Sequence, residues 1–247
     1  MDFALSPDQA AILESVRDWV RAELAPQMIA IDEGGKHPWA QQHTLGEMGV
    51  WGALFPEEYG GAGLDFLTYI LLLEEVSYGC FNTGLAMSVH TMSGTAIAKF
   101  GTEEQKAHWL PDLASGQKLI AFCLSEPDAG SDAASLKCRA VRNGDMYVLN
   151  GTKAWISFGG DAHLYLVYAV TTPDLPGGKG ISAFLVDPDT PGLTWGEDEK
   201  KMGGNALANR QMHLTDARVP ASALLGDEGQ GFKIAMAGLN GGRIGVA

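Results

Sequence analysis

The sequence predicts an α+β protein with more than one domain, in which helices come first and strands follow. Apolar residues recur at helical spacing over residues 6–115, alternate with polar residues over 116–220, and return to helical spacing near Gly229. Helices and strands in separate runs favour separate α and β domains over a Rossmann sheet. We therefore expect an all-α domain over 1–115, an antiparallel β-barrel-like domain over 116–220 and the start of a C-terminal helical bundle over 221–247.

Two capping boxes mark expected helix starts in the first domain. Ser6 precedes Pro7 and lies three residues before Gln9, and Thr102 lies three residues before Gln105. A serine or threonine cap with glutamine at the third helical position satisfies two backbone donors at once, and proline fits the first helical position. We expect helices to begin at both places.

Two more helices are expected between these boxes. Asp65 is a good N-cap for one, and Asn82 for another that runs to Phe100 and stops at Gly101. Pro111 is expected to end the helix that begins after Thr102, because proline lacks the N–H that a helix interior needs.

Alternating apolar and polar residues predict strands in the second domain. Asn143-Gly144 and Asn150-Gly151 are expected to form tight turns between neighbouring strands. The final helical pattern reaches Ala247 without a cap or a breaker, so we expect the chain to be a piece of a longer protein. The expected strands are 118–124, 136–142, 146–149, 153–157, 164–170, 181–186 and 211–214.

Composition limits the partners and the compartment. With 17 Lys+Arg against 30 Asp+Glu the formal net charge is -13, which disfavours nucleic acid and anionic lipid. Three cysteines without paired spacing indicate a reducing compartment, and the six histidines show no metal spacing. The N-terminal residues do not resemble a secretion signal, and no apolar run is long enough to cross a bilayer. We expect a cytoplasmic protein without a metal site or a membrane span.

Two polar segments could carry chemistry. In the segment 122–132 an apolar strand runs into a turn with two hydroxyls, which could direct N–H and O–H donors at one ligand edge. The turn alone favours a simpler interpretation, a surface turn capped by Ser131 or Asp132. A second strand places Trp155 and Ser157 on one face, although Trp155 alone would favour a place in the core.

Taken together, these segments and their order resemble the acyl-CoA dehydrogenase family of flavoproteins over essentially the whole chain. The short stretch Gly238–Ile244 looks most like the isobutyryl-CoA, or short branched-chain, branch of that family. The motifs that carry the family resemblance are Pro56-Glu57-Glu58-Tyr59-Gly60-Gly61, Phe100-Gly101-Thr102-Glu103-Glu104-Gln105-Lys106, Ser125-Glu126-Pro127 with Gly130-Ser131-Asp132, Asn150-Gly151-Thr152-Lys153 with Trp155-Ile156-Ser157, Lys201-Met202-Gly203 and Gly229-Gln230-Gly231-Phe232.

The resemblance implies an FAD held against the β domain and an acyl-CoA beside it. Trp155 would pack on the flavin, Ser157 would bind near its hydride-accepting nitrogen, and Gly130 would lie near the pyrophosphate. The implied cofactor-binding residues are Phe122, Leu124, Ser125, Gly130, Ser131, Trp155, Ile156 and Ser157. The implied substrate-binding residues are Ser131, Asn240 and Arg243.

The implied reaction is α,β-dehydrogenation of a short, branched acyl-CoA, as in fatty acid metabolism and branched-chain amino acid degradation. The family takes the α proton with a glutamate, and this chain has Gly242 at one family location for it. Glu126 and Glu228 do not match the base by position. We therefore expect the base beyond Ala247, an inactive isolated chain, a homotetramer in the complete protein, and an electron-transferring flavoprotein as partner.

Two alternatives and one departure accompany the resemblance. A flavin oxidase or monooxygenase of the same fold would react with oxygen instead, and a binding or assembly module would perform no catalysis. Asp128 puts a carboxylate next to the implied pyrophosphate site, where it would repel phosphates unless it points to solvent.

Overall fold

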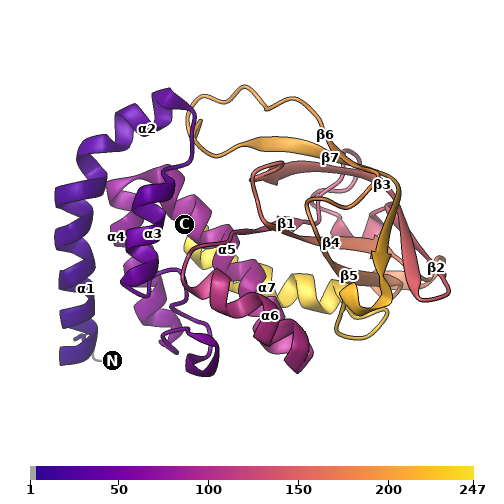
Figure 1. Cartoon of the computed structure of the whole chain (residues 1–247), viewed down its shortest axis with the longest axis horizontal. Coiled ribbons are helices and arrows are strands. Elements are labelled where there is room, and N and C mark those ends of the chain that lie inside the picture. Colours follow the sequence, from indigo (N-terminus) through magenta and orange to yellow (C-terminus); the bar gives the residue numbers. More distant parts are fainter. Residues whose placement is uncertain (1–3) are drawn as a thin grey trace.

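The computed structural model describes residues 4–247 and places the helices on one side of the molecule and the sheet on the other (Figure 1). The expected order of helices, then strands, then a final helix is confirmed. The helices of the first part are α1 (Pro7–Trp19), a π-helical turn (Val20–Leu24), a 3-10 turn (Ala25–Gln27), α2 (Met28–Gly34), α3 (Trp39–Glu47), a 3-10 turn (Glu57–Tyr59), α4 (Phe66–Gly79), α5 (Phe81–Phe100) and α6 (Glu103–Ala114).

Side-chain caps fix three of these helix starts as expected. The Ser6 hydroxyl accepts the Gln9 N–H while the Gln9 side chain accepts the Ser6 N–H, and Thr102 forms the same capping box with Gln105 before α6. Asp65 accepts the N–H of the third residue of α4.

Two expected helix boundaries are wrong. The helix α5 begins at Phe81 rather than after Asn82, because the Asn82 side chain binds Asp32 and the Ala206 N–H across the molecule instead of capping. Pro111 lies inside α6 instead of ending it. The helix continues for one more turn because Leu113 and Ala114 are buried in the core there, which offsets the one hydrogen bond that proline cannot donate.

The strands form one eight-stranded sheet in the order β6-β7-β3-β2-β4-β5-β8, with β1 beside β4. Most pairs are antiparallel as expected, but β1 pairs in parallel with β4, and β2 meets β4 in parallel at one point. The strands are β1 (Ile120–Cys123), β2 (Arg139–Asn143), β3 (Met146–Ser157), β4 (Leu164–Val170), β5 (Ile181–Val186), β6 (Leu193–Trp195), β7 (Asn209–Pro220) and β8 (Leu224–Leu225).

One expected turn is present and the other is not. Gly144 has a φ of 64° and turns the chain between β2 and β3. Asn150-Gly151 is not a turn, because β3 continues through it with a register shift between Leu149 and Gly151. Pairing with the long strand β7 on one side and β2 on the other keeps this dipeptide extended.

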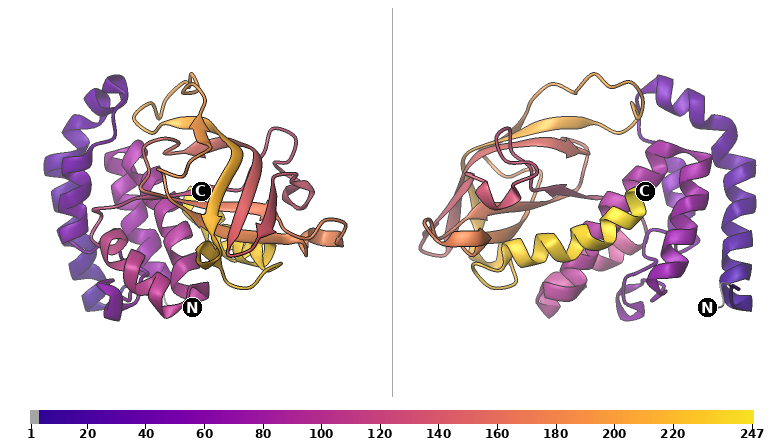
Figure 2. Two further views of the ribbon diagram at one scale, coloured as in Figure 1. Left: turned by 45° about the vertical axis from the view of Figure 1, so that its right-hand side comes forward. Right: turned by 180° about the vertical axis from the view of Figure 1, so that it is seen from behind.

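The last helix, α7 (Gly231–Val246), connects the two parts of the molecule. It packs against α5 of the helical part and against β5 of the sheet. Seen from behind, it runs from the sheet toward the helices (Figure 2). The space between the sheet and α5 and α7 is therefore bounded by all three expected segments of the chain.

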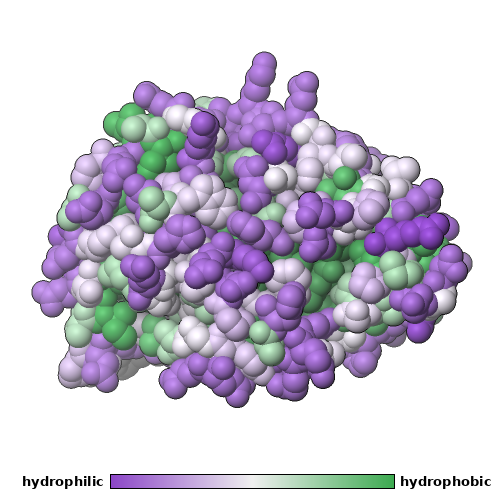
Figure 3. All heavy atoms as spheres, viewed as in Figure 1, coloured by the Kyte–Doolittle hydropathy of each residue, from purple (hydrophilic) through white to green (hydrophobic). Residues whose placement is uncertain are grey.

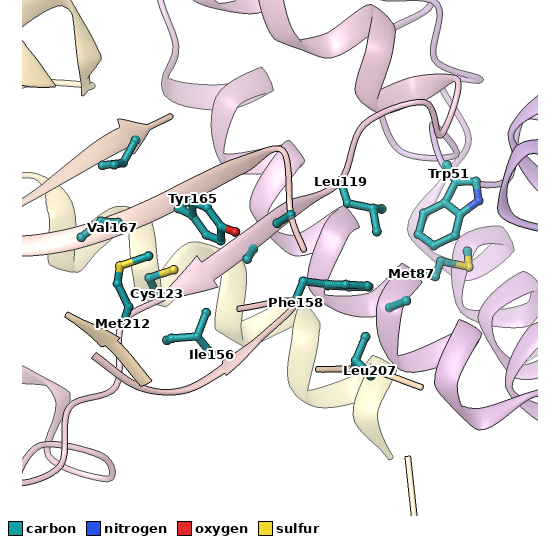
Figure 4. Packing of buried hydrophobic residues seen from close by; sticks show 14 of the residues in the cluster. Trp51, Met87, Leu119, Cys123, Ile156, Phe158, Tyr165, Val167, Leu207 and Met212 are labelled. Atoms are coloured by element: carbon teal, nitrogen blue, oxygen red, sulfur yellow. The ribbon is translucent and has the colours of Figure 1, made fainter. Parts of the chain in front are cut away.

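One buried core extends across the helical part and the sheet. Trp51 and Met87 of the helical part lie close to Leu119 and Phe158, and Ile156 lies deeper in the sheet beside Cys123 (Figure 4). The surface seen in Figure 3 is mostly polar, with apolar side chains gathered over α2, where Met28 and Ile29 are exposed.

A carboxylate joins the helical part to the segment between β6 and β7. Asp32 of α2 accepts the Asn205 N–H at 2.7 Å, the Asn205 amide at 3.0 Å and the Asn82 amide at 3.1 Å. These hydrogen bonds, led by the Asn205 N–H, lower the pKa of Asp32 and keep it ionised. The long segment between β6 and β7 is thereby held against α2, as Figure 1 shows.

Two structural features are absent from residues 4–247. No helix there combines the length and the apolar character that a membrane span requires. In the same residues, no three histidine, cysteine, aspartate or glutamate side chains are grouped closely enough to hold a metal ion.

A close approach between α3 and the end of α6 makes Gly46 sensitive to any side chain. A Cβ atom on Gly46 would lie 2.0 Å from the Ser115 carbonyl oxygen, whereas a Cβ on Gly34 would meet nothing within 4 Å. We expect Gly46→Ala to lower the free energy of unfolding by about 1 to 3 kcal/mol. Gly34→Ala, the matched control, should change it by less than about 1 kcal/mol. Urea unfolding of both variants tests this, and equal stability of the two would contradict the packing.

Two buried histidines should make the protein less stable in acid. Burial lowers the pKa of His37 to about 4 and that of His90 to about 3. The unfolded chain then binds more protons than the folded one as pH falls from about 6.5 toward these values, so stability is lost across that range. Each histidine should contribute up to about 1.4 kcal/mol per pH unit.

The variant His90→Gln tests this linkage. Its amide can still donate to the Leu113 carbonyl, which His90 Nε2 contacts at 3.1 Å, but it cannot titrate. The fall in unfolding free energy between pH 7 and pH 5 should be smaller in this variant than in the wild type. An identical slope in the variant and the wild type would refute the assignment.

Candidate functional site

Most residues expected to bind a cofactor or substrate surround one cavity of about 440 Å³ between the sheet, α5 and α7. We call it the Trp155 cavity. The α5 residues of its wall and the apolar residues of α7 were not predicted from the sequence as site residues. Its lining residues are Val89, Met92, Phe122, Leu124, Ser125, Gly130, Ser131, Asp132, Ala133, Ala134, Trp155, Ser157, Phe232, Met236, Leu239, Asn240 and Arg243.

A β-bulge in β3 directs Trp155 into this cavity. Three steps along β3, from Lys153 to Ile156, face only two steps along β7, from Met212 to Arg210, and Trp155 has a φ of 61°. An extra residue in one strand breaks the usual alternation of sides. Trp155 is 64% exposed, while Lys153, two residues earlier, is fully buried. The exposed indole is thus a property of the bulge and not of simple alternation.

The two serines lie where the strands end. Ser157 is the last residue of β3, and Ser125 lies shortly after the end of β1. The Ser125 carbonyl accepts the Ala154 N–H at 2.8 Å. That hydrogen bond joins the two segments directly at the bulge. Both side chains line the Trp155 cavity together with the indole.

Ile156 is the one expected cofactor residue that does not line the cavity. Its side chain is 1% exposed and packs in the core near Cys123 and Met212, as Figure 4 shows. The side chains of Trp155 and Ser157 point the other way, which is the alternation expected for these three residues.

The turn after Ser125 is a small closed unit. Glu126 and Ala129 exchange two backbone hydrogen bonds, at 2.9 and 3.2 Å, so Gly130 and Ser131 begin just where the turn closes. A Cβ on Gly130 would meet nothing within 4 Å, so the space beside its backbone is open. Asp128 is exposed and points toward Lys137, at 3.5 Å, and so it does not line the cavity.

A buried ion pair behind the cavity was not expected from the sequence. Lys153 Nζ lies 2.8 Å from Glu126 Oε1; Lys153 is fully buried and Glu126 is 7% exposed. Glu126 also accepts the N–H of Lys137 and of Cys138, and Lys153 donates to the Leu124 carbonyl at 3.2 Å. Charged residues are rarely buried unless they are paired and hydrogen-bonded in this way. Both residues lie in motifs that carry the family resemblance, but nothing in their spacing along the chain predicts that they pair.

The α7 side of the cavity carries the expected substrate residues. Asn240 and Arg243 line it, and among its described lining residues only Asp132 and Arg243 are charged. Asn240 and Met92 also line a neighbouring cavity of about 320 Å³ between α4, α5 and α7, and Gly242 lies in that second wall. A ligand could therefore extend from the Trp155 cavity along α7.

The arrangement suits a flat aromatic ligand with a polar edge. An exposed indole offers a ring face, the hydroxyls of Ser125, Ser131 and Ser157 offer neutral donors, and the rest of the wall is mostly apolar. Binding sites for organic cofactors typically combine apolar walls with a few placed polar groups. Neutral donors can stabilise negative charge that develops on such a ligand without reorganisation.

Comparison with known proteins gives the same two segments. The family model for the acyl-CoA dehydrogenase N-terminal domain matches residues 6–117, and that for the acyl-CoA dehydrogenase middle domain matches residues 121–217. A short-chain specific mitochondrial acyl-CoA dehydrogenase of Bos taurus is 45% identical over 235 residues, which are 95% of this chain and 57% of that protein.

Solved structures support the same family assignment. Butyryl-CoA dehydrogenase from Megasphaera elsdenii aligns with a TM-score of 0.93 and 41% identity, over 100% of this chain and 65% of that one. A chain in the structure described as the electron transferring flavoprotein of Acidaminococcus fermentans aligns with a TM-score of 0.95 and 43% identity, over 100% and 65%. The enzymes among these relatives are named for short-chain and butyryl-CoA substrates and not for isobutyryl-CoA, so they support the family and not the expected branch.

The chain spans 57% to 65% of the length of these relatives. Both matched domains occur in the order and over the residues of the helical part and the sheet described above. The chain therefore belongs to the acyl-CoA dehydrogenase family.

Proposed function

We propose that the protein binds FAD in the Trp155 cavity and uses it in the α,β-dehydrogenation of a short acyl-CoA. The observation that carries this proposal is the exposed indole of Trp155 beside the Ser125 and Ser157 hydroxyls on one cavity wall. A large aromatic side chain is usually buried, so an indole left exposed in a cavity indicates a ligand that covers it.

The residues present fit a flavin. The ring face of Trp155 can cover one face of a fused ring system, while the serine hydroxyls can donate to its polar edge. The open space at Gly130 allows a phosphate to approach the backbone, and the orientation of Asp128 toward Lys137 removes the repulsion expected from the sequence. When bound, FAD supplies the acceptor for the hydride that leaves the β carbon.

The protein's own groups would then orient the flavin and stabilise its charge. Ser125 and Ser157 would donate hydrogen bonds to the ring edge where negative charge develops, and the apolar wall from α7 would exclude water. We assign the polar tail of the acyl-CoA to Ser131, Asn240 and Arg243, since Arg243 is the cation of this wall that can pair with phosphate.

The group that removes the α proton is not assigned to the cavity wall. The described lining residues of the Trp155 cavity include no glutamate, and Gly242, which lines the adjoining cavity, has no side chain. We propose that a glutamate outside this sequence performs the step, as the family resemblance implies. Asp132 is the carboxylate that the cavity itself contains, and it lies on the turn that holds Ser131.

We also propose the partners of the complete protein. An electron-transferring flavoprotein as electron acceptor is supported by the similarity to the Acidaminococcus fermentans structure. A homotetramer as the assembled state is proposed from the family resemblance of the sequence. The buried free thiols of Cys80, Cys123 and Cys138 support a reducing compartment, which we propose to be the cytoplasm.

FAD titration tests the cofactor assignment. We expect the protein to quench flavin fluorescence on binding, and Trp155→Ala to weaken binding by about tenfold, because a stacking surface is lost. Trp155→Phe should retain most of the affinity. Ser157→Ala should weaken binding by about fivefold through loss of one hydrogen bond, whereas Ser157→Thr should not. Affinities independent of these residues would place the cofactor elsewhere.

Spectral titration of the FAD-loaded protein with butyryl-CoA and isobutyryl-CoA tests the substrate. Both should perturb the flavin absorption, and a stronger response to isobutyryl-CoA would favour the branched-chain expectation.

The same titration tests the role of Arg243. The variant Arg243→Gln should weaken binding of the acyl-CoA by about fivefold by removing a phosphate contact. Arg142→Gln, on an exposed strand away from the cavity, is the matched control. A thioester that binds the two variants equally would refute the role of Arg243, and peroxide formed at the rate of turnover would favour the oxidase alternative.

A further inference from the structure

We propose that Lys153 and Glu126 are positioning residues, and that their buried ion pair holds the segments of the Trp155 cavity in the arrangement that binds the flavin. This inference rests on the proposed function. It deepens that function by naming residues that act through others, since the buried pair does not line the cavity.

Three segments that form the cavity converge on this ion pair. Lys153 Nζ donates to the Leu124 carbonyl at 3.2 Å and to Glu126 Oε1 at 2.8 Å, which ties β3 to the residues on either side of Ser125. Glu126 Oε1 also accepts the Cys138 N–H at 2.9 Å, and its other oxygen accepts the Lys137 N–H at 2.6 Å. The Glu126 carboxylate thus holds together the two ends of the loop that carries Gly130 and Ser131.

The ion pair also lies directly beside the bulge in β3. Lys153 lies just before the register break, and Trp155, with its φ of 61°, lies two residues later. A left-handed backbone at a bulky residue is unfavourable and persists only where the surroundings impose it. The Lys153 side chain, drawn inward to Glu126, and the Ala154 N–H, bonded to the Ser125 carbonyl at 2.8 Å, fix the two residues before Trp155.

The ion pair is isolated from solvent and from other charges. The groups that face it from neighbouring strands are the thiols of Cys123 and Cys138, and burial raises the pKa of the Cys138 thiol to about 11. Both thiols are therefore neutral at physiological pH. Neither lysine nor glutamate finds a substitute partner there, so loss of one leaves the other unpaired.

The experiment compares FAD affinity and thermal stability in single and double variants. Lys153→Met and Glu126→Gln each leave one partner unmatched, and we expect each to lower the temperature of unfolding strongly. The double variant Lys153→Met/Glu126→Gln removes both charges and keeps similar volume, and we expect it to unfold near the wild-type temperature. The flavin should nevertheless bind to it at least about tenfold more weakly, with less quenching of flavin fluorescence, because the indole and the hydroxyls are no longer held together.

The matched control is Arg17→Met/Glu75→Gln, which removes an ion pair between α1 and α4, away from the cavity. It should leave both FAD affinity and quenching at wild-type values. The proposal is overturned if the stable double variant binds FAD within about twofold of the wild type, or if the control loses affinity to the same extent. A double variant that fails to fold also overturns it, because the charges would then be needed for folding itself.

The two proposals fail in different ways. If the wild-type chain does not bind FAD, the proposed function fails, and this inference fails with it. If the wild type binds FAD with an affinity that depends on Trp155 while the double variant is unaffected, only the positioning role is refuted.

Discussion

Lys153 and Glu126 place opposite charges inside the sheet, and the surrounding structure depends on their pairing. A buried ammonium group is tolerated only with a partner and further hydrogen bonds, and here those come from the Leu124 carbonyl and from Glu126. The same carboxylate holds the N–H groups of Lys137 and Cys138. One interaction therefore connects the end of β1, the turn after it and the middle of β3.

The bulge in β3 allows one strand to contribute both to the buried ion pair and to the cavity wall. Because three residue steps of β3 face two of β7, Lys153 can point into the core while Trp155 faces the cavity. Ile156 then returns to the core, and Ser157 lies at the cavity wall again. A regular strand would put Lys153 and Trp155 on the same side, so it could not serve both the ion pair and the cavity.

The helices supply the other wall. The helix α7 packs on α5 and on β5, which brings Asn240 and Arg243 of the last segment opposite residues that precede them by about a hundred positions. Asp32 and Asn205 hold the segment between β6 and β7 to the helical part. The cavity is thus formed by segments of the helical part, the sheet and α7 that lie far apart in the sequence.

The sequence alone determined the order of helices and strands, three helix caps and nine of the ten predicted site residues that line the cavity, because periodicity and capping are local and the motifs are contiguous. It could not determine that Pro111 stays inside α6, that β3 continues through Asn150-Gly151, or that β1 pairs in parallel with β4. It also did not reveal the Lys153–Glu126 pair. Each of these depends on what distant segments offer: burial of Leu113 and Ala114, pairing with β7, or an opposite charge 27 residues away. Such long-range contacts exist only in the folded chain, and only the tertiary structure decides them.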